Sequence, residues 1–152
     1  MTRSLRYGAI LAALLACATI APTAAQQAPL QDKPFAEHKV VLQLSDGDPR
    51  KQALVLSVAN NLLKFYDPDK VALEVVAFGP GIDLLRTGSD HRKQVESLIA
   101  QGVRFDVCLN TVDTIERETG KRPDIIPSAT PVQVGVGQIL FLTDNGYTLV
   151  RP

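Results

Sequence analysis

The sequence predicts a single-domain α/β fold in three layers, with a mostly parallel sheet of about five strands and helices on both faces. Short runs rich in Val and Leu, of strand length, alternate along the chain with longer segments whose apolar residues recur at helical spacing. Without an N-terminal leader, about 127 of the 152 residues remain, a length suited to one hydrophobic core. Strict alternation of strand and helix favours parallel strands joined by helical crossovers.

The N-terminal segment predicts an export signal. Residues 1–25 contain a basic start, an apolar run and small residues at the end, as expected of a signal peptide cleaved before Gln26. The apolar run is shorter than the roughly 20 residues that a membrane-spanning helix needs, so we expect it to be removed. An alternative interpretation treats residues 14–17 as a lipoprotein box, which would anchor the protein to a membrane through Cys17.

The rest of the chain divides into an arm and a domain. Residues 26–37 are polar, contain two prolines and lack periodicity, and they predict a flexible N-terminal arm. Residues 38–152 form the domain. After leader removal 14 basic and 16 acidic side chains remain, since two of the 16 basic residues are Arg3 and Arg6, and no basic run occurs. Nucleic acid and anionic membranes are therefore poor candidate partners, because they require clustered Lys and Arg.

The first half of the domain is expected to contain two strands and their following helices. The elements are a strand over 39–44, a helix over 49–66, a strand over 72–78, a turn or short helix over 81–86, and a helix over 90–101. Pro49 suits the first turn of its helix. The apolar face of that helix is expected to consist of Leu54, Val58, Leu62 and Phe65.

The second half continues the alternation. The expected elements are a strand over 103–109, a helix over 111–118, a strand over 129–134, a helix over 136–145 and a last strand over 147–151. Gly102 separates the third strand from the preceding helix, as a glycine at a helix C-terminus does.

In a parallel α/β sheet, ligands bind where the loops gather at the carboxyl ends of the strands. Candidate residues follow three of the predicted strands. The candidates are Ser45 and Asp46 after the first strand, Gly79 after the second, and Cys108, Asn110 and Thr111 at the end of the third.

Cys108 is the most informative of these, because it is the one cysteine that remains once Cys17 leaves with the leader. Exported proteins typically use cysteines in pairs. Side-chain alternation along the third strand puts Cys108 on the same face as Arg104 and Asp106. The start of the following helix would favour a thiolate, so we expect a thiol that solvent can reach. The alternative is a small buried apolar residue without chemistry.

No metal or cofactor is predicted. The two histidines, His38 and His91, stand far apart. Asp46 and Asp48 lack the further carboxylates of a calcium loop, so they predict turn and helix-cap chemistry. The glycines at 79–81 and 135–137 lack the third glycine of a dinucleotide site and predict turns.

Four segments carry a family resemblance: 38–45, 73–81, 102–111 and 146–152. Together they resemble the DsrE/DsrF-like family over about residues 38–152. The most specific part is the Gly-Val pair followed by a cysteine at the end of the third strand. The resemblance implies a compact α/β/α sandwich that assembles into homo- or hetero-oligomers and needs no cofactor.

The resemblance also implies a function. In sulfur-relay members, the cysteine at the position of Cys108 receives sulfane sulfur as a persulfide and passes it to a partner thiol. We therefore expect an exported, periplasmic sulfur carrier or sulfurtransferase, with Ser45, Asp46, Gly79, Asn110 and Thr111 lining the site. Its partners would be sulfur donor and acceptor proteins or small sulfane-sulfur compounds. Two alternatives stay open: a non-catalytic oligomeric module that binds a ligand or protein, and a thiol redox sensor.

Overall fold

The computed structural model describes residues 27–152, so the predicted signal peptide and Cys17 lie outside the described residues. The elements are, in chain order, β1 (His38–Leu44), α1 (Pro49–Tyr66), β2 (Val71–Ala77), the 3₁₀ helix η1 (Gly79–Leu85), α2 (Arg92–Ala100), β3 (Arg104–Cys108), α3 (Leu109–Thr119), β4 (Thr130–Val132), α4 (Gly135–Asp144) and β5 (Thr148–Val150).

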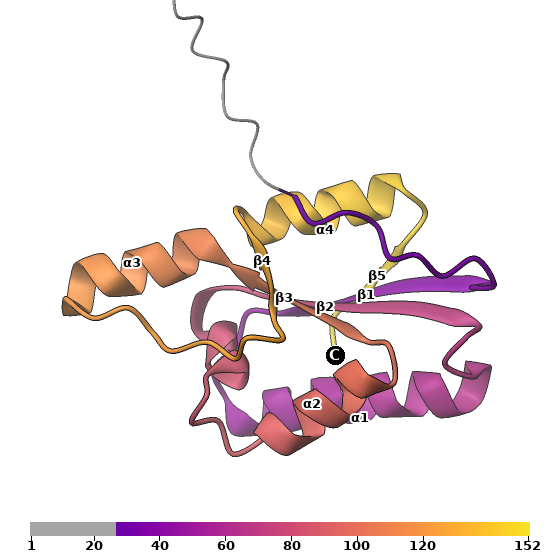
Figure 1. Cartoon of the computed structure of the whole chain (residues 1–152), viewed down its shortest axis with the longest axis horizontal. Coiled ribbons are helices and arrows are strands. Elements are labelled where there is room, and N and C mark those ends of the chain that lie inside the picture. Colours follow the sequence, from indigo (N-terminus) through magenta and orange to yellow (C-terminus); the bar gives the residue numbers. More distant parts are fainter. Residues whose placement is uncertain (1–26) are drawn as a thin grey trace, which may run out of the picture.

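The five strands form one parallel sheet in the order β4-β3-β2-β1-β5. Helices α1 and α2 cover one face and α4 lies on the opposite face, while α3 extends beyond the ends of the strands (Figure 1). The predicted three-layer α/β fold with five parallel strands is confirmed. No helix within residues 27–152 is both long and apolar enough to cross a membrane.

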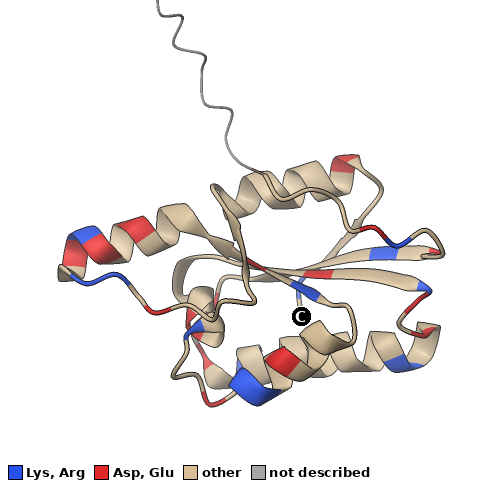
Figure 2. Cartoon of the chain, in the orientation of Figure 1, with Lys and Arg blue, Asp and Glu red and all other residues tan. Residues whose placement is uncertain are grey.

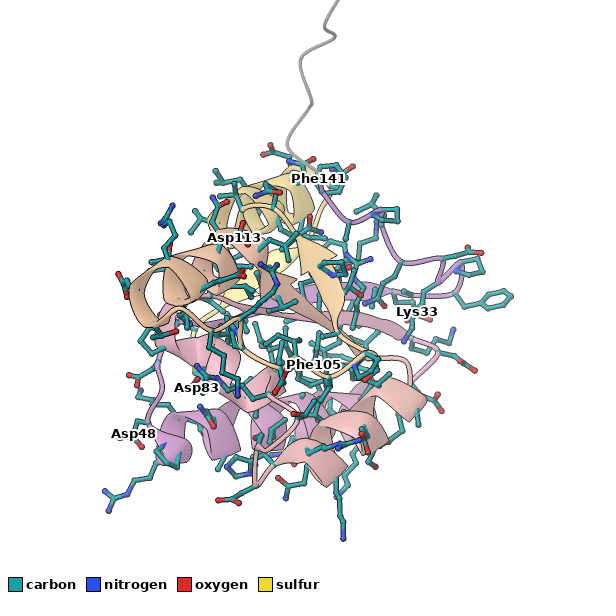
Figure 3. The ribbon with its side chains drawn as sticks, turned by 60° about the vertical axis from the view of Figure 1, so that its left-hand side comes forward. Lys33, Asp48, Asp83, Phe105, Asp113 and Phe141 are labelled. Carbon is teal, nitrogen blue, oxygen red and sulfur yellow. The ribbon has the colours of Figure 1, made fainter. Side chains whose placement is uncertain are left out.

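The larger apolar core lies between the sheet and the layer of α1 and α2. Val103, Phe105 and Val107 point into it, and Figure 3 shows Phe105 on this side of the sheet. Alternation then directs Arg104 and Asp106 to the face of α4, as the sequence predicts.

The predicted apolar face of α1 is wrong for two of its four residues. Leu54 and Phe65 are 44% and 79% exposed, whereas Val58 and Leu62 pack partly against the core. The buried stripe consists instead of Val55, Leu56, Ala59 and Leu63, together with Gln52. Each residue turns the helix by about 100°, so two neighbouring apolar stripes are both compatible with the sequence, and packing against the sheet and α2 decides between them.

Two element boundaries near the carboxyl ends of the strands also differ from the prediction. α3 begins at Leu109, two residues earlier than expected, so Cys108 is both the last residue of β3 and the N-cap of α3. The glycines at 135–137 do not form a turn, because Gly135 opens α4 after the extended N-cap Val134.

The N-terminal arm lies against the α4 face of the sheet, where its polar side chains bind backbone carbonyls. Gln31 donates from Nε2 to the carbonyl of Leu73 at 2.9 Å. Lys33 donates from Nζ to the carbonyls of Pro68 and Val71 at 2.9 and 3.1 Å. In Figure 1 the arm runs beside α4 on its way to β1. The second, smaller apolar cluster lies under this layer and consists of Val41, Ala72, Val76, Ile139, Leu142 and Tyr147.

Candidate functional site

Cys108 lies where β3 ends and α3 begins, which puts it at the carboxyl edge of the sheet, as predicted. The residue is only 4% exposed. The expectation that solvent reaches the thiol is therefore wrong for this conformation. The physical reason is that the first turn of α4 lies directly over the sulfur.

Two backbone groups contact the sulfur. The N–H of Gly135 donates to Cys108 Sγ at 3.3 Å, and Sγ lies 3.8 Å from the carbonyl oxygen of Gln133, to which the thiol donates. A Cβ at position 135 would lie 3.0 Å from Phe78 Cβ and 3.2 Å from Cys108 Cβ, so glycine is what allows this approach. We call residues 133–135 the sulfur cover.

The sulfur is adjacent to the N-termini of two helices. Cys108 is itself the N-cap of α3, and the amide that reaches its sulfur is the first amide of α4. Unpaired amides and the helix dipole favour negative charge at such ends. The sulfur accepts the first amide of α4, whereas the Cys108 side chain makes no capping hydrogen bond to α3.

Three of the other predicted site residues meet beside this point. The N–H of Gly79 donates to Thr111 Oγ1 at 2.9 Å, which joins the end of β2 to the first turn of α3. A Cβ at Gly79 would lie 3.7 Å from the carbonyl oxygen of Ser45, so the end of β1 is also close. The structure thus brings Ser45, Gly79 and Thr111 together at the carboxyl edge.

Asn110 is tied to the sulfur cover. Its N–H donates to the carbonyl of Gln133 at 3.2 Å, and its Oδ1 accepts from Gln133 Nε2 at 2.8 Å. The same Gln133 carbonyl accepts from the thiol of Cys108. Asn110 therefore holds the cover through a residue that also contacts the sulfur.

Asp46 is used for local structure. Its Oδ1 accepts from the N–H of Asp48 at 2.8 Å, and Asp48 Oδ1 accepts from the N–H of Arg50 at 2.7 Å as the N-cap of α1. The predicted turn and cap chemistry of these two carboxylates is confirmed.

A buried ionic cluster occupies the same face of the sheet as Cys108. Glu74 on β2 and Asp106 on β3 are both fully buried, and Arg104 forms ion pairs with each of them, the one to Asp106 Oδ1 at 3.0 Å. Within residues 27–152, Glu74 Oε1 and both oxygens of Asp106 accept no hydrogen bond. Two buried carboxylates thus face one guanidinium, a combination that favours a bound proton.

Burial is the main cause of the altered acidity of this cluster. Desolvation raises the pKa of Asp106 to about 8; Arg104 opposes this rise and the Glu74 carboxylate adds to it. Desolvation also raises the pKa of Glu74, against the effect of Arg104. Burial raises the pKa of the neighbouring Tyr147 as well. The raised pKa favours the protonated form of Asp106, which can donate to Glu74.

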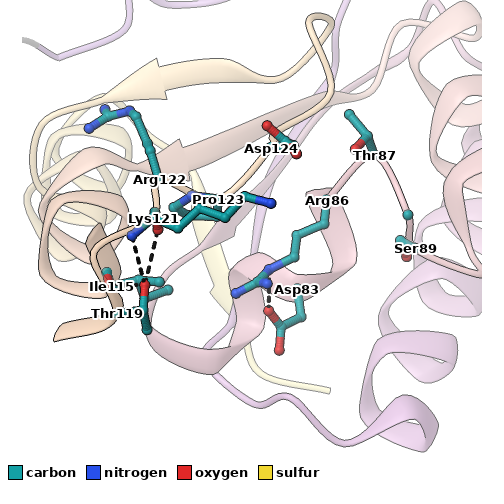
Figure 4. Close-up of a pocket in the computed structure, with 11 residues that line it drawn as sticks. Asp83, Arg86, Thr87, Ser89, Ile115, Thr119, Lys121, Arg122, Pro123 and Asp124 are labelled. Carbon is teal, nitrogen blue, oxygen red and sulfur yellow. Dashed lines mark hydrogen bonds and ion pairs between the residues drawn. The ribbon is translucent and has the colours of Figure 1, made fainter. Parts of the chain in front are cut away.

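Two of the cavities that adjoin α3 are also lined by residues of η1. One, of about 570 Å³, is bordered by predicted site residues, and its lining is Gly79, Pro80, Asp83, Arg86, Asn110, Thr111, Thr114, Ile115 and Glu118. The other, of about 700 Å³, shares Asp83, Arg86 and Ile115 with it and extends to the loop at 121–124. Figure 4 shows the Asp83–Arg86 ion pair and the bonds from Thr119 to Lys121 in this second cavity. Cys108 lines neither cavity.

Sequence reasoning missed three residues of this site: Glu74, Gln133 and Gly135. Glu74 had a visible signal, since it is one charged residue inside the apolar run of β2. Gln133 and Gly135 had none that identifies them, because their contact with Cys108 depends on how the chain returns from β4 to α4.

Comparison with solved structures places the chain in a family. The structure of MTH1491, a protein of unknown function from Methanobacterium thermoautotrophicum, superimposes with a TM-score of 0.68 and 32% sequence identity. The match covers 76% of this chain and all of the MTH1491 chain. The chain belongs to the same family as MTH1491. No model of a known protein family matches the sequence, and no curated protein matches it.

Proposed function

We propose that this protein is an exported sulfur carrier or sulfurtransferase of the DsrE/DsrF-like type, which binds sulfane sulfur as a persulfide on Cys108. The observation that carries the proposal is the hydrogen bond from the first amide of α4 to Cys108 Sγ, on a cysteine that is itself the N-cap of α3. A backbone amide aimed at the sulfur can stabilise the sulfur anion that a sulfur-transfer step forms. The family resemblance of the surrounding sequence supports the same assignment.

The reaction needs no net electron transfer. The thiolate of Cys108 attacks the outer sulfur of a persulfide donor, a new S–S bond forms, and the donor leaves as a thiolate. In the second step an acceptor thiolate attacks the outer sulfur of the Cys108 persulfide, and Cys108 leaves as a thiolate. The Gly135 amide can stabilise negative charge on Cys108 before the first step and after the second.

The cavity lined by Gly79, Asn110 and Thr111 is the route that we assign to the donor. Asn110 lines this cavity and also binds Gln133 of the sulfur cover, so one residue links the cavity to the cover.

Mass spectrometry of the intact mature protein tests the proposal. After incubation with a persulfide donor, the wild type should gain one sulfur atom, about 32 Da, and Cys108→Ser should gain none. An equal gain in both proteins, or no gain in the wild type under donor excess, contradicts the proposal and favours a non-catalytic binding module.

We also propose that the protein is periplasmic and that its leader is removed near Gln26. The proposal is supported by the composition of residues 1–25, which contain a short apolar run and small residues before the expected cleavage point. N-terminal sequencing of the exported protein should begin near Gln26. A lipid on Cys17, or an intact leader in the membrane fraction, would instead support the lipoprotein alternative.

Homo-oligomer formation is a further part of the proposal. The monomer already pairs Arg104 with Glu74 and Asp106, so the polar face of β3 does not require a second subunit. The support comes from α4, which exposes Val136 and Leu140 by 49% and 59%. Its one charged residue, Asp144, lies at the helix end (Figure 2). An exposed apolar helix face without charges fits a contact with a second copy of the chain.

A further inference from the structure

We propose that residues 27–33 act as a strap that holds the first turn of α4 over Cys108, so that release of the strap controls entry to the thiol. This inference rests on the proposed function, because it assigns a regulatory role to the contacts around the same sulfur. It starts from the burial of Cys108, since a 4% exposed residue cannot meet a donor without some local opening.

The strap is bound to α4 through Gln138. This side chain is fully buried, and its carboxamide makes two bonds with one residue of the arm: Oε1 accepts from the N–H of Ala28 at 3.0 Å, and Nε2 donates to the Ala28 carbonyl at 3.3 Å. Gln138 lies three residues after Gly135, which is one turn of the helix. The arm therefore binds α4 one helical turn away from the amide that contacts Cys108 Sγ.

Apart from Gln138, hydrogen bonds of Gln133 and Gly135 with Asn110 and Cys108 hold the first turn of α4, and apolar packing contributes little. Val134 and Val136 are exposed, so the sulfur cover has no large apolar side chain buried against the sheet. The second half of α4 differs, because Ile139 and Leu142 belong to the apolar cluster beneath it. The first turn can thus open while the rest of the helix stays in place, since segments with few buried apolar contacts open at low free energy.

The strap itself is held mainly by hydrogen bonds to groups on the sheet. Arg104 donates from Nη1 to the carbonyl of Pro29, and Gln31 binds the carbonyl of Leu73. Lys33 binds the carbonyl of Val71 at the start of β2 and that of Pro68 in the turn before it. Leu30, between these contacts, is exposed. Such a segment can leave the sheet without opening the apolar core.

The test is the rate at which iodoacetamide alkylates Cys108 in the folded mature protein. Mass spectrometry of the tryptic peptide 105–117, which contains Cys108, reports this rate independently of any other cysteine. Gln138→Met keeps the side-chain length and removes both bonds to Ala28, and we expect it to accelerate alkylation about tenfold. Gln31→Ala, which removes the strap's hydrogen bond to Leu73 on β2, should accelerate it about threefold.

The matched control is Gln101→Met on the other side of the sheet. Gln101 donates to the carbonyl of Ser97 at an exposed site, so this variant should alkylate at the wild-type rate. Low urea concentrations distinguish local opening from global unfolding, because local opening exposes little surface and its rate depends weakly on urea.

Three results would overturn the strap. The first is alkylation of Cys108 at the wild-type rate in both Gln138→Met and Gln31→Ala. The second is an accelerated alkylation rate that depends on urea as strongly as global unfolding does. The third is alkylation of Cys108 in the folded wild type as fast as in the unfolded chain. Alkylation needs no sulfur donor, so this outcome is independent of the persulfide assay. A strap that controls alkylation in a protein that takes up no sulfur would leave the inference standing and the proposed function refuted.

Discussion

The N–H of Gly135 points at the sulfur of Cys108 from a distance of 3.3 Å, across 27 residues of sequence. The contact joins the end of β3 to the start of α4, which are the two places where polar backbone groups converge on the thiol. Its geometry depends on the absence of a side chain at position 135, because a Cβ there would lie 3.0 Å from Phe78 Cβ.

Gly135→Ala should therefore destabilise the protein and loosen the sulfur cover. The new Cβ meets atoms close to the backbone of Phe78 and Cys108, which cannot move aside as a flexible side-chain end would. We expect a loss of about 1–3 kcal/mol in the free energy of unfolding, as for other overpacked sites, and faster alkylation of Cys108. Urea unfolding and thiol labelling measure the two effects.

Gly137→Ala is the matched control, two residues along the same helix. Its nearest neighbour would be Val134 Cβ at 3.4 Å, an ordinary contact, and alanine favours the helix. This variant should be as stable as the wild type or more stable. Equal stability of the two alanine variants would show that the tight contact at Gly135 has no energetic consequence.

Arg104→Met should destabilise the protein strongly. The substitution keeps much of the side-chain volume but leaves Glu74 and Asp106 buried without a cation. Removal of one partner from a buried ionic group costs about 3–5 kcal/mol. The loss should be smaller at pH 5 than at pH 8, because burial raises the pKa of both carboxyls and a protonated carboxyl needs no cation. Urea unfolding at the two pH values measures it.

The comparison variant for Arg104→Met is Arg122→Met. Arg122 also pairs with two carboxylates, Asp113 and Glu116, but all three side chains are about half exposed. Water screens such pairs, so little change in stability is expected. A similar loss in both variants would mean that the burial of the Arg104 cluster does not govern its contribution.

The layers and the number of strands could be predicted from the sequence, because strand-length apolar runs and helical spacing of apolar residues are both local signals. Seven-residue runs such as β2 identify strands by composition alone, and Asp67-Pro68 stops α1. The buried stripe of α1 did not follow, since Leu54 and Val55 lie on adjacent stripes and only the contact with the sheet and α2 distinguishes them.

The candidate site was predictable only in part for a similar reason. The positions of Ser45, Gly79, Cys108 and Thr111 follow from the rule that the carboxyl ends of parallel strands share one edge. The burial of Cys108 does not, because it depends on the first turn of α4, which contacts the sulfur across 27 residues of sequence. Long-range contacts of backbone amides leave no pattern in the sequence.

Assembly through α4 predicts a specific effect of charge. Leu140→Glu places a carboxylate in the exposed apolar face of α4, and burial of that charge against a second copy would be costly. Light scattering should report an oligomer for the wild type and a smaller species for Leu140→Glu. Phe65→Glu, on the opposite side of the sheet, should leave the mass unchanged, and a wild type that stays monomeric at micromolar concentration contradicts the idea.

Stability should fall as pH rises from about 4 to about 8, because Asp106 binds a proton more tightly in the folded protein than in the unfolded chain. Its folded pKa is raised from 3.8 to about 8, so between these values the folded state holds a proton that the unfolded state has lost. The stabilisation from this proton is complete below the unfolded pKa and is lost as the pH rises through the folded pKa. Between the two pKa values, the free energy of unfolding falls by at most about 1.4 kcal/mol per pH unit. Asp106→Asn mimics the protonated carboxyl and should flatten this dependence, whereas Asp113→Asn on the surface of α3 should preserve it. Urea unfolding from pH 5 to 9 measures the slopes, and equal slopes in Asp106→Asn and the wild type would show that no proton is held at Asp106.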